Sequence, residues 1–415
     1  MEEEEQQQRD NRLLLLQHPN FLLALYVAGI AGALIQIIGA QWDVSWHVLE
    51  LVETFFTVPH TVLYLGVTFS LLSSLIALGY YHRIVLYNGE RNRFLLHGFI
   101  IALAGSGLQL FAGQFDYWWH DNFGFDPFLF TPSHMPLIIG FFLNGIGMWI
   151  GISYLIRNEK SRILNLALRE TFPTRIRLLQ ILAILSLVAL WYDLTTQVHL
   201  FTDVSGIAYT FHLDEKTFMD QTGTIAFVSS IAATAAIGSI MLIAAKSTLK
   251  FRGAASVIAA LLIGTSIAFN IGFRAIVLNG NEEGSTLAYF IPLYISFLAP
   301  VVLFDILAGK RLLTAKGRRT TTPIRWVILT SVLLGPVGTF LDSWYSVELW
   351  IPTNQMLLLW LLPMLAGGFA AGLVWIGFNN ILLNKLKATR IKAAADSGNN
   401  SVLSPQTKGT NQEQD

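Results

Sequence analysis

The chain has 415 residues and a formal net charge of zero, and 53% of its residues are hydrophobic whereas only 13% are charged. Soluble domains carry about one quarter charged residues, so this composition argues against a soluble protein and makes the lipid bilayer the expected partner. The sequence contains no cysteine, which excludes disulfides, thiolate metal ligands and cysteine nucleophiles, and no basic face indicates binding of nucleic acid.

The first twelve residues, MEEEEQQQRDNR, are acidic and polar and lack the features of a secretory signal, so we expect residues 1–19 to form a cytoplasmic N-terminal segment before an uncleaved first span. After this segment, apolar runs long enough to cross about 30 Å of hydrocarbon recur along the chain. They are continuously apolar and do not alternate as barrel strands do. We therefore predict an all-α polytopic membrane helical bundle of about ten transmembrane helices. The predicted spans are 20–41, 58–81, 94–115, 132–156, 177–194, 222–245, 253–278, 286–309, 324–341 and 355–383.

The first two pairs of spans, at about 20–81 and 94–156, resemble each other and predict a duplicated helical hairpin. One copy reads LIQIIGAQWDVSWH and continues to VPHTVLYLG, and the other reads GLQLFAGQFDYWWH and continues to TPSHMPLIIG. The matches are polar and aromatic, whereas Leu, Ala or Gly matches between membrane helices arise easily by chance. The matching pairs are Gln36/Gln109, Gln41/Gln114, Asp43/Asp116, Trp46/Trp119, His47/His120 and His60/His134.

The spans after residue 177 predict diverged copies of the same hairpin. The third hairpin keeps Asp193 and the fifth keeps Asp342, but neither has a histidine one turn later, and the fourth hairpin has no histidine at all. Only the first two hairpins therefore keep the complete Asp/His/His set. The residues at or near the site positions of the later hairpins are Gln197, His199, His212, Asn270, Arg274 and Ser346.

The predicted transmembrane domain covers residues 20–390, and the polar residues 391–415 predict a disordered cytoplasmic tail. All Lys and Arg residues except Lys216 and Arg274 lie at the termini or in the connections that follow even-numbered spans. The positive-inside rule therefore predicts that both termini are cytoplasmic and that the loops within the hairpins face outward. We expect a multi-pass protein of the plasma membrane.

The repeated polar residues form a predicted metal site at the outward end of each hairpin. Asp43 and His47 are one helical turn apart and project from one face, and His60 opens the neighbouring helix. Two imidazoles and one carboxylate suit Cu(II), Zn(II) or non-haem Fe(II) and leave coordination positions open. The second site consists of Asp116, His120 and His134. Nearby acidic residues are candidate acceptors for the outer imidazole N–H groups: Glu50, Glu53, Asp121 and Asp126.

The spacing Asp43-x3-His47-x12-His60, with Pro-His opening the second helix, resembles the metal site in the C subunit of copper membrane monooxygenases, the methane and ammonia oxidising enzymes. The resemblance covers one hairpin motif per copy, and the second copy departs from it by one loop residue. The wider pattern of Asp-Trp-Trp-His, Phe-Gly-x-Asp and Pro-x-His also resembles uncharacterised prokaryotic multi-pass membrane proteins. The resemblance implies metal ligation by both triads and favours copper over zinc or iron.

Several functions are compatible with this pattern. We expect a copper-dependent oxidoreductase or an accessory subunit that works with other membrane subunits. Alternatives are a transporter or permease for a metal ion or small solute, haem ligation by histidine pairs, and a structural subunit in which Asp–His hydrogen bonds close the hairpins. No P-loop, dinucleotide-binding glycine pattern, HExxH or Gly-x-Ser-x-Gly motif is present, so ATP-driven transport and common hydrolase chemistry are unsupported.

Polar residues away from the triads have predicted structural roles. Gln36 and Gln109 lie about two helical turns inside the membrane and are expected to form interhelical hydrogen bonds. We expect Arg274 to pair with Glu282 or Glu283. Asp305 is expected to pair with Lys310 or Arg311 or to reach the interface.

Overall fold

The structure is a computed structural model that describes residues 19–49, 51–52, 54–88, 93–124, 131–163, 172–202, 251–278 and 298–308, together with scattered positions between 237 and 249. These residues contain helices and turns and no strand. The helices are α2 (Pro19–Val48), α3 (Val58–Asn88), α4 (Arg93–Phe123), α5 (His134–Ile163), α6 (Phe172–Thr202), α9 (Ala254–Ser266), the π-helix η1 (Ile267–Gly272), α10 (Phe273–Leu278) and α13 (Leu298–Ala308).

Six stretches of helix in this part of the chain are long and apolar enough to cross a membrane, so the protein is an all-helical membrane protein. The first five predicted spans and the predicted span 253–278 each coincide with one of them. The predicted span 286–309 is described only from Leu298 onward, and most of 222–245 lies outside the described residues, as do 324–341 and 355–383. The six stretches are Phe21–His47, Val58–Tyr80, Leu96–Phe123, His134–Ile156, Ile176–Thr196 and Ala254–Val277.

The helices are longer than the predicted spans, and this difference positions the polar residues. Helix α2 has 30 residues, which at 1.5 Å per residue extends it to about 45 Å, well beyond the hydrocarbon core. Helix α4 likewise continues to Phe123. Asp43 and Asp116 therefore lie in regular helix near the ends of α2 and α4.

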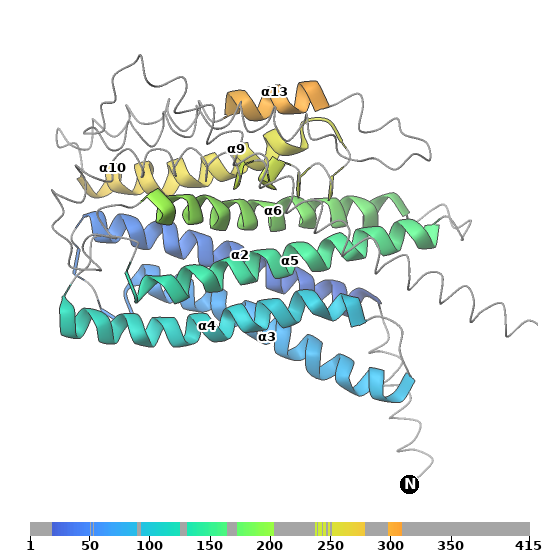
Figure 1. The fold of residues 1–415 in the computed structure, drawn as a ribbon, viewed down its shortest axis with the longest axis horizontal. Helices are drawn as coiled ribbons and strands as arrows, with labels where there is room; N and C mark the ends of the chain where they lie inside the picture. The colour runs from blue at the N-terminus through green and yellow to red at the C-terminus, as the bar shows by residue number, and fades with distance from the viewer. Residues whose placement is uncertain are drawn as a thin grey trace, which may run out of the picture.

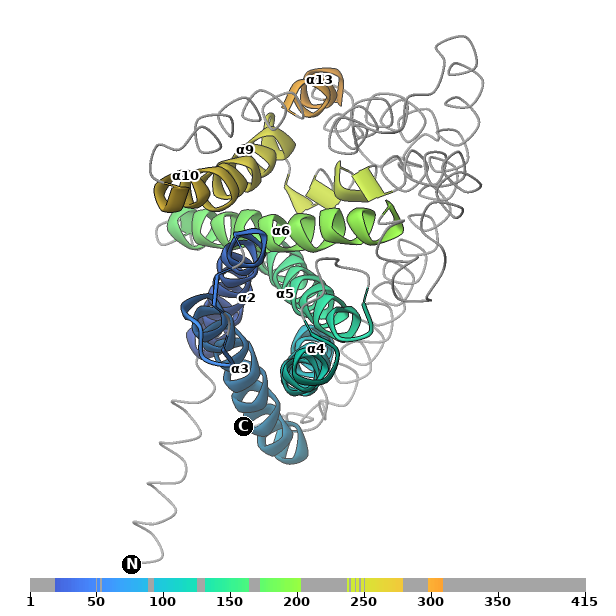
Figure 2. The same ribbon diagram turned by 90° about the vertical axis from the view of Figure 1, so that its left-hand side faces the viewer.

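Helices α2 to α6 lie side by side and run alternately in opposite directions (Figure 1). Seen from the end, α6 lies between the α2–α5 group and α9 (Figure 2). The main apolar core joins these layers and includes the fully buried side chains of Trp191 on α6, Tyr26 on α2 and Met148 on α5. The α2–α3 and α4–α5 hairpins therefore form one packed unit against α6.

Glycines allow the two helices of each hairpin to cross closely. A Cβ atom on Gly32 would lie 2.7 Å from the backbone oxygen of Gly66, and a Cβ atom on Gly105 would lie 2.7 Å from the backbone oxygen of Gly140. Such separations leave no room for a side chain, so these crossings depend on glycine. Gly32 and Gly105 occupy matching positions in the two repeated sequences, as do Gly66 and Gly140.

A ladder of buried polar side chains connects the two hairpins. Gln109 Nε2 donates to Gln36 Oε1 at 2.9 Å, which confirms the predicted interhelical hydrogen bonding of this pair. Gln36 Nε2 donates to Ser70 Oγ at 3.0 Å, and Asn144 Nδ2 donates to Gln109 Oε1 at 2.7 Å. Each glutamine therefore binds its own hairpin partner and the glutamine of the other hairpin, and the ladder fixes the distance between α2 and α4.

We expect Gln109→Leu to lower the free energy of unfolding by about 1–3 kcal/mol, because it leaves buried polar groups of Gln36 and Asn144 without this partner. The measurement is unfolding in mixed detergent micelles followed by circular dichroism. The double variant Gln36→Leu/Gln109→Leu should lose less than the sum of the two single variants, because both partners of one hydrogen bond are replaced together. If the losses of unfolding free energy in the two single variants add up to the loss in the double variant, Gln36 and Gln109 are not coupled.

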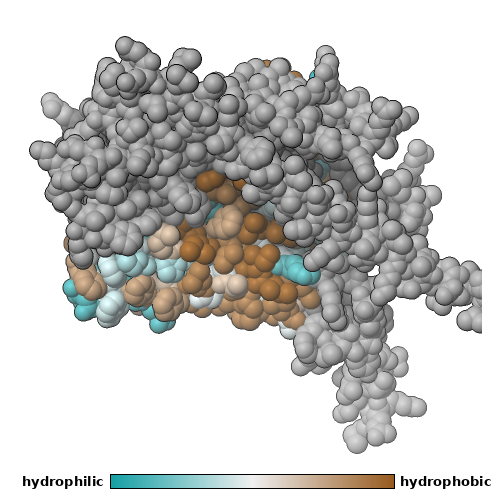
Figure 3. All heavy atoms as spheres, in the orientation of Figure 1, coloured by the Kyte–Doolittle hydropathy of each residue, from teal (hydrophilic) through white to brown (hydrophobic). Residues whose placement is uncertain are grey.

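The surface of this unit carries many exposed apolar side chains on α3 and α4. Figure 3 shows a hydrophobic region over the middle of the visible described surface and more hydrophilic residues toward its left-hand end. Exposed aliphatic and aromatic residues of this kind face lipid in membrane helices. They include Leu65, Phe69, Leu72, Leu75, Ile100, Leu110 and Phe111.

Two polar residues outside the hairpins have hydrogen-bond partners that the sequence did not indicate. Asp305 Oδ2 accepts hydrogen bonds from the backbone N–H and the hydroxyl of Ser256, both at 2.8 Å, so this carboxylate binds the first turn of α9. Its expected partners Lys310 and Arg311 lie outside the described residues. Arg274 Nε donates to Ser45 Oγ at 3.3 Å on α2, and its expected acidic partners also lie outside the described residues.

Candidate metal centre

The first triad lies where α2 ends and α3 begins. Asp43 and His47 are on one face of the last turns of α2, and His60 is in the first turn of α3. Asp43 Oδ2 is 3.4 Å from His47 Nε2, and Asp43 Oδ1 is 3.1 Å from His60 Nε2. Both carboxylate oxygens therefore face an imidazole nitrogen, one from each helix.

The second triad has the same arrangement where α4 ends and α5 begins. Asp116 Oδ2 is 3.6 Å from His120 Nε2, and Asp116 Oδ1 is 3.6 Å from His134 Nε2. In each triad, ligand atoms from the three residues lie within 4.8 Å of one another, so either group could hold a metal ion. The structure thus brings together all six residues that the sequence singled out, as two groups of three.

At the second triad, the separations fit ligands of a shared ion better than hydrogen-bonded side chains, whereas the 3.1 Å between Asp43 Oδ1 and His60 Nε2 also suits a hydrogen bond. Bonds of about 2.0–2.1 Å meeting at a tetrahedral angle separate two ligand atoms by roughly 3.3 Å. A hydrogen bond between a charged imidazole and a carboxylate is shorter, at about 2.7–2.9 Å. The two separations at Asp116, both 3.6 Å, are too long for hydrogen bonds but remain within reach of a common cation.

The outer nitrogens of the imidazoles also have defined partners. His60 Nδ1 lies 3.1 Å from the backbone oxygen of Thr54, and His120 Nδ1 lies 3.1 Å from the backbone oxygen of Gly124. A carbonyl oxygen only accepts hydrogen bonds, so Nδ1 carries the proton in both rings. In the neutral ring, Nε2 then presents its lone pair toward the carboxylate, as a metal ligand requires.

Sequence reasoning missed these outer partners because it considered side chains only. The expected acceptors Glu50, Glu53 and Asp126 lie outside the described residues. The partners found for His60 and His120 are backbone carbonyls, which every residue has and which no motif identifies. Gly124 has a φ of 81°, a left-handed conformation that favours glycine and ends α4 directly after the triad.

His134 is oriented by a side chain, which makes this contact testable. Its Nδ1 lies 3.0 Å from the hydroxyl of Thr131, a buried residue in the turn before α5. We expect Thr131→Val, which keeps the shape and removes the hydroxyl, to weaken metal binding at the second triad by about 10–100-fold. Thr68→Val is the control, because the Thr68 hydroxyl binds only the preceding turn of its own helix. Isothermal titration with Cu(II) measures the metal affinity of both variants. Equal affinities of Thr131→Val and Thr68→Val would contradict this role for Thr131.

The segments η1 and α10 pack against the end of α2. Ser45 Oγ donates to the backbone oxygen of Phe269 at 3.0 Å, and the Phe273 ring lies 5.5 Å from the Trp42 ring. Gln41 Nε2 donates to Ser266 Oγ at 3.3 Å. A π-helix shifts side chains by one position relative to an α-helix. The η1 segment therefore supports the turn of α2 that carries Asp43.

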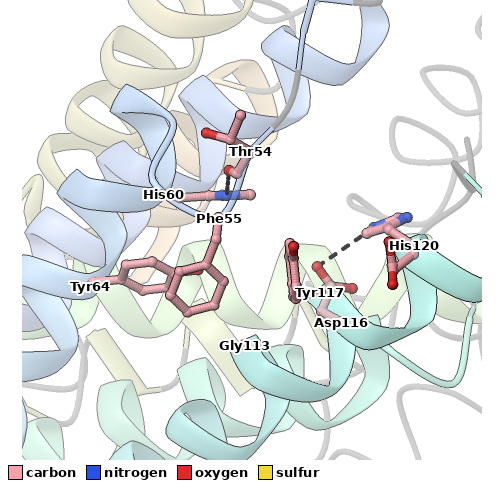
Figure 4. A pocket seen from close by; sticks show the side chains of 9 residues that line it. Thr54, Phe55, His60, Tyr64, Gly113, Asp116, Tyr117 and His120 are labelled. Atoms are coloured by element: carbon pink, nitrogen blue, oxygen red, sulfur yellow. Dashed lines mark hydrogen bonds and ion pairs between the residues drawn. The ribbon is translucent and has the colours of Figure 1, made fainter.

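The two triads lie next to each other. The rings of His47, in the first triad, and His120, in the second, have centroids 6.2 Å apart. Within the second triad, the rings of His120 and His134 have centroids 6.0 Å apart. A pocket of about 330 Å³ lies beside them (Figure 4). His60 reaches it from the first triad, and Asp116 and His120 reach it from the second. Its other lining residues are Thr54, Phe55, Tyr64, Gly113, Tyr117 and Asp121.

The later hairpins add no third triad within the part of the chain that the structure describes. Asp193 is buried on α6, 2% exposed, and belongs to neither group of ligands. The side chains of Gln197, His199 and Asn270 lie outside the description, as do residues His212, Asp342 and Ser346.

No family model matches the sequence, and no curated protein and no solved structure matches it. The function therefore has to be inferred from the two triads, the pocket beside them and their position at one end of the membrane helices.

Proposed function

We propose that this protein is an integral membrane metalloprotein that holds a divalent transition metal at outward-facing Asp/His/His sites. The first site is Asp43, His47 and His60, and the second is Asp116, His120 and His134. The protein would act as a copper-dependent oxidoreductase or as an accessory subunit of one. The plasma membrane, with both termini in the cytoplasm, is the location that the distribution of Lys and Arg favours.

The observation that carries this proposal is the geometry around Asp116. Two imidazole nitrogens face its two oxygens at 3.6 Å, too far for hydrogen bonds and close enough for a shared ion. The bond between His120 Nδ1 and a backbone carbonyl directs the Nε2 lone pair inward. At the second triad, a structural role through Asp–His hydrogen bonds would require shorter contacts.

Copper is favoured over zinc and iron for two reasons. Nitrogen and oxygen sites bind Cu(II) more tightly than the other divalent ions of the first transition series. The Asp-x3-His-x12-His spacing also resembles the copper membrane monooxygenase subunit. Each triad supplies three ligands, so the ion keeps open positions for water or for a ligand from the pocket.

We further propose that the α2–α3 and α4–α5 hairpins are copies of one ancestral hairpin. Equivalent residues make equivalent contacts, since Gln36 binds Ser70 as Gln109 binds Asn144. Gly32 meets Gly66 as Gly105 meets Gly140. A duplication explains why a metal site occurs twice at the same end of the bundle.

Metal content tests the proposal directly. Protein purified from membranes and reconstituted with copper should hold up to two copper ions per chain, measured by inductively coupled plasma mass spectrometry. The double variant Asp43→Asn/Asp116→Asn keeps the shape of both side chains and should hold none. Wild-type protein without metal above background, or a double variant with unchanged content, would rule out these sites.

Redox activity separates an enzyme from an accessory subunit. Copper-loaded protein with a membrane-soluble quinol as electron donor should consume oxygen if the centre is itself an oxidoreductase, and the double variant should not. Bound copper without oxygen uptake would favour the accessory role. Copper accumulation in proteoliposomes would instead favour a transporter.

A further inference from the structure

The two triads lie close to each other. The His47 and His120 rings, one from each triad, have centroids only 6.2 Å apart. Each ion would lie about 2.0–2.1 Å from its ring nitrogen, so both ions would lie at the end of the bundle that these two rings share. The Gln36–Gln109 hydrogen bond deeper in the membrane holds α2 and α4 at this spacing.

The pocket of about 330 Å³ is lined by one residue of the first triad and two residues of the second. His60 of the first triad lines one side, and Asp116 and His120 of the second line the other (Figure 4). Gly113 contributes no side chain between them. Aromatic rings of Phe55, Tyr64 and Tyr117 complete the lining, with ring centroids of Phe55 5.2 Å from Tyr64 and 5.5 Å from Tyr117.

The charge of the triads indicates what the pocket would take. Two divalent ions carry four positive charges, whereas Asp43, Asp116 and the pocket residue Asp121 supply three negative charges, and the imidazoles are neutral as ligands. The excess positive charge in a partly buried site favours a small anion with oxygen or nitrogen donor atoms. The open coordination positions of both ions provide its binding sites.

We propose that the two triads form one two-metal centre and that a small anion in the pocket contacts both ions. This inference rests on the proposed metal binding. It adds that the two ions interact and share a ligand, and the glycine at position 113 keeps the space for that ligand open.

Electron paramagnetic resonance of the Cu(II)-loaded protein tests the interaction between the ions. The wild type should give a dipolar-broadened spectrum with a half-field signal, whereas Asp43→Asn and Asp116→Asn should each give the spectrum of one isolated Cu(II). If the wild type binds two copper ions but its spectrum equals the sum of the two single-variant spectra, the two-metal centre is wrong and the separate metal sites stand. If no copper binds, the proposed function itself fails.

Azide, a small anion that gives a charge-transfer absorption band on Cu(II), tests the shared pocket. A Cβ atom on Gly113 would lie 3.6 Å from the Tyr64 ring, so the Gly113→Leu side chain would extend into the pocket. We expect Gly113→Leu to keep both copper ions and to weaken azide binding at least about tenfold. Gly107→Leu is the matched control on the same helix, because a Cβ atom there meets no atom within 4 Å. Equal azide affinity in both variants would overturn the assignment of this pocket.

Discussion

Replacement of Asp43 by asparagine is expected to remove one of two copper ions per chain and leave the other in place. The carboxylate is the only anionic ligand of the first triad and faces both imidazoles, at 3.4 Å and 3.1 Å. Loss of a residue that only orients a ligand costs about 10–100-fold in metal affinity, so loss of the ligand itself should cost more than 100-fold. Asp116→Asn should remove the other ion by the same reasoning.

Two controls make this result specific. His97→Ala replaces an exposed histidine near the start of α4, far along that helix from His120, and should leave both ions bound. The isosteric change from Asp to Asn preserves packing, and unchanged unfolding in detergent would show that metal loss does not come from misfolding. A single variant that loses both ions would instead show that the sites bind only as a pair, and one that loses neither would exclude that aspartate as a ligand.

Much of the candidate site could be predicted because its residues are close in sequence. Asp43 and His47 are one turn apart in α2, and a short connection brings His60 beside them. Helical periodicity and hairpin topology determine such contacts, and the repeat indicated that the same contacts occur twice. The triads therefore converge as the spacing predicts, although the identity of the ion depends on chemistry that no spacing determines.

Contacts between distant segments could not be predicted in the same way. Hydropathy indicates which residues lie in the membrane but not which helices are neighbours, because a lipid-facing and a helix-facing leucine look alike. The contact between Ser45 and Phe269, the binding of Asp305 to Ser256 and the pocket shared by both triads all depend on such packing. The polarity of Gln36 and Gln109 predicted that each forms an interhelical hydrogen bond, but it did not identify the partner.

The two repeats differ at the position of Gly39. A Cβ atom on Gly39 would lie 2.7 Å from the backbone nitrogen of Leu63, so α2 and α3 touch one turn away from the first triad. The second repeat has Ala112 at this position. The separations between carboxylate and imidazole are 3.6 Å in the second triad, compared with 3.1 Å and 3.4 Å in the first.

Gly39→Leu should therefore separate α2 from α3 and abolish copper binding at the first triad while the second triad keeps its ion. The side chain would meet the backbone of Leu63, which cannot move aside as a flexible side chain can, and overpacking of this kind costs about 1–3 kcal/mol of stability. Gly79→Leu on α3 is the matched control, since a Cβ atom there meets no atom within 4 Å. Copper stoichiometry and unfolding in detergent measure both effects. If Gly39→Leu kept both ions at unchanged affinity, the close crossing of α2 and α3 would not be what brings His60 to Asp43.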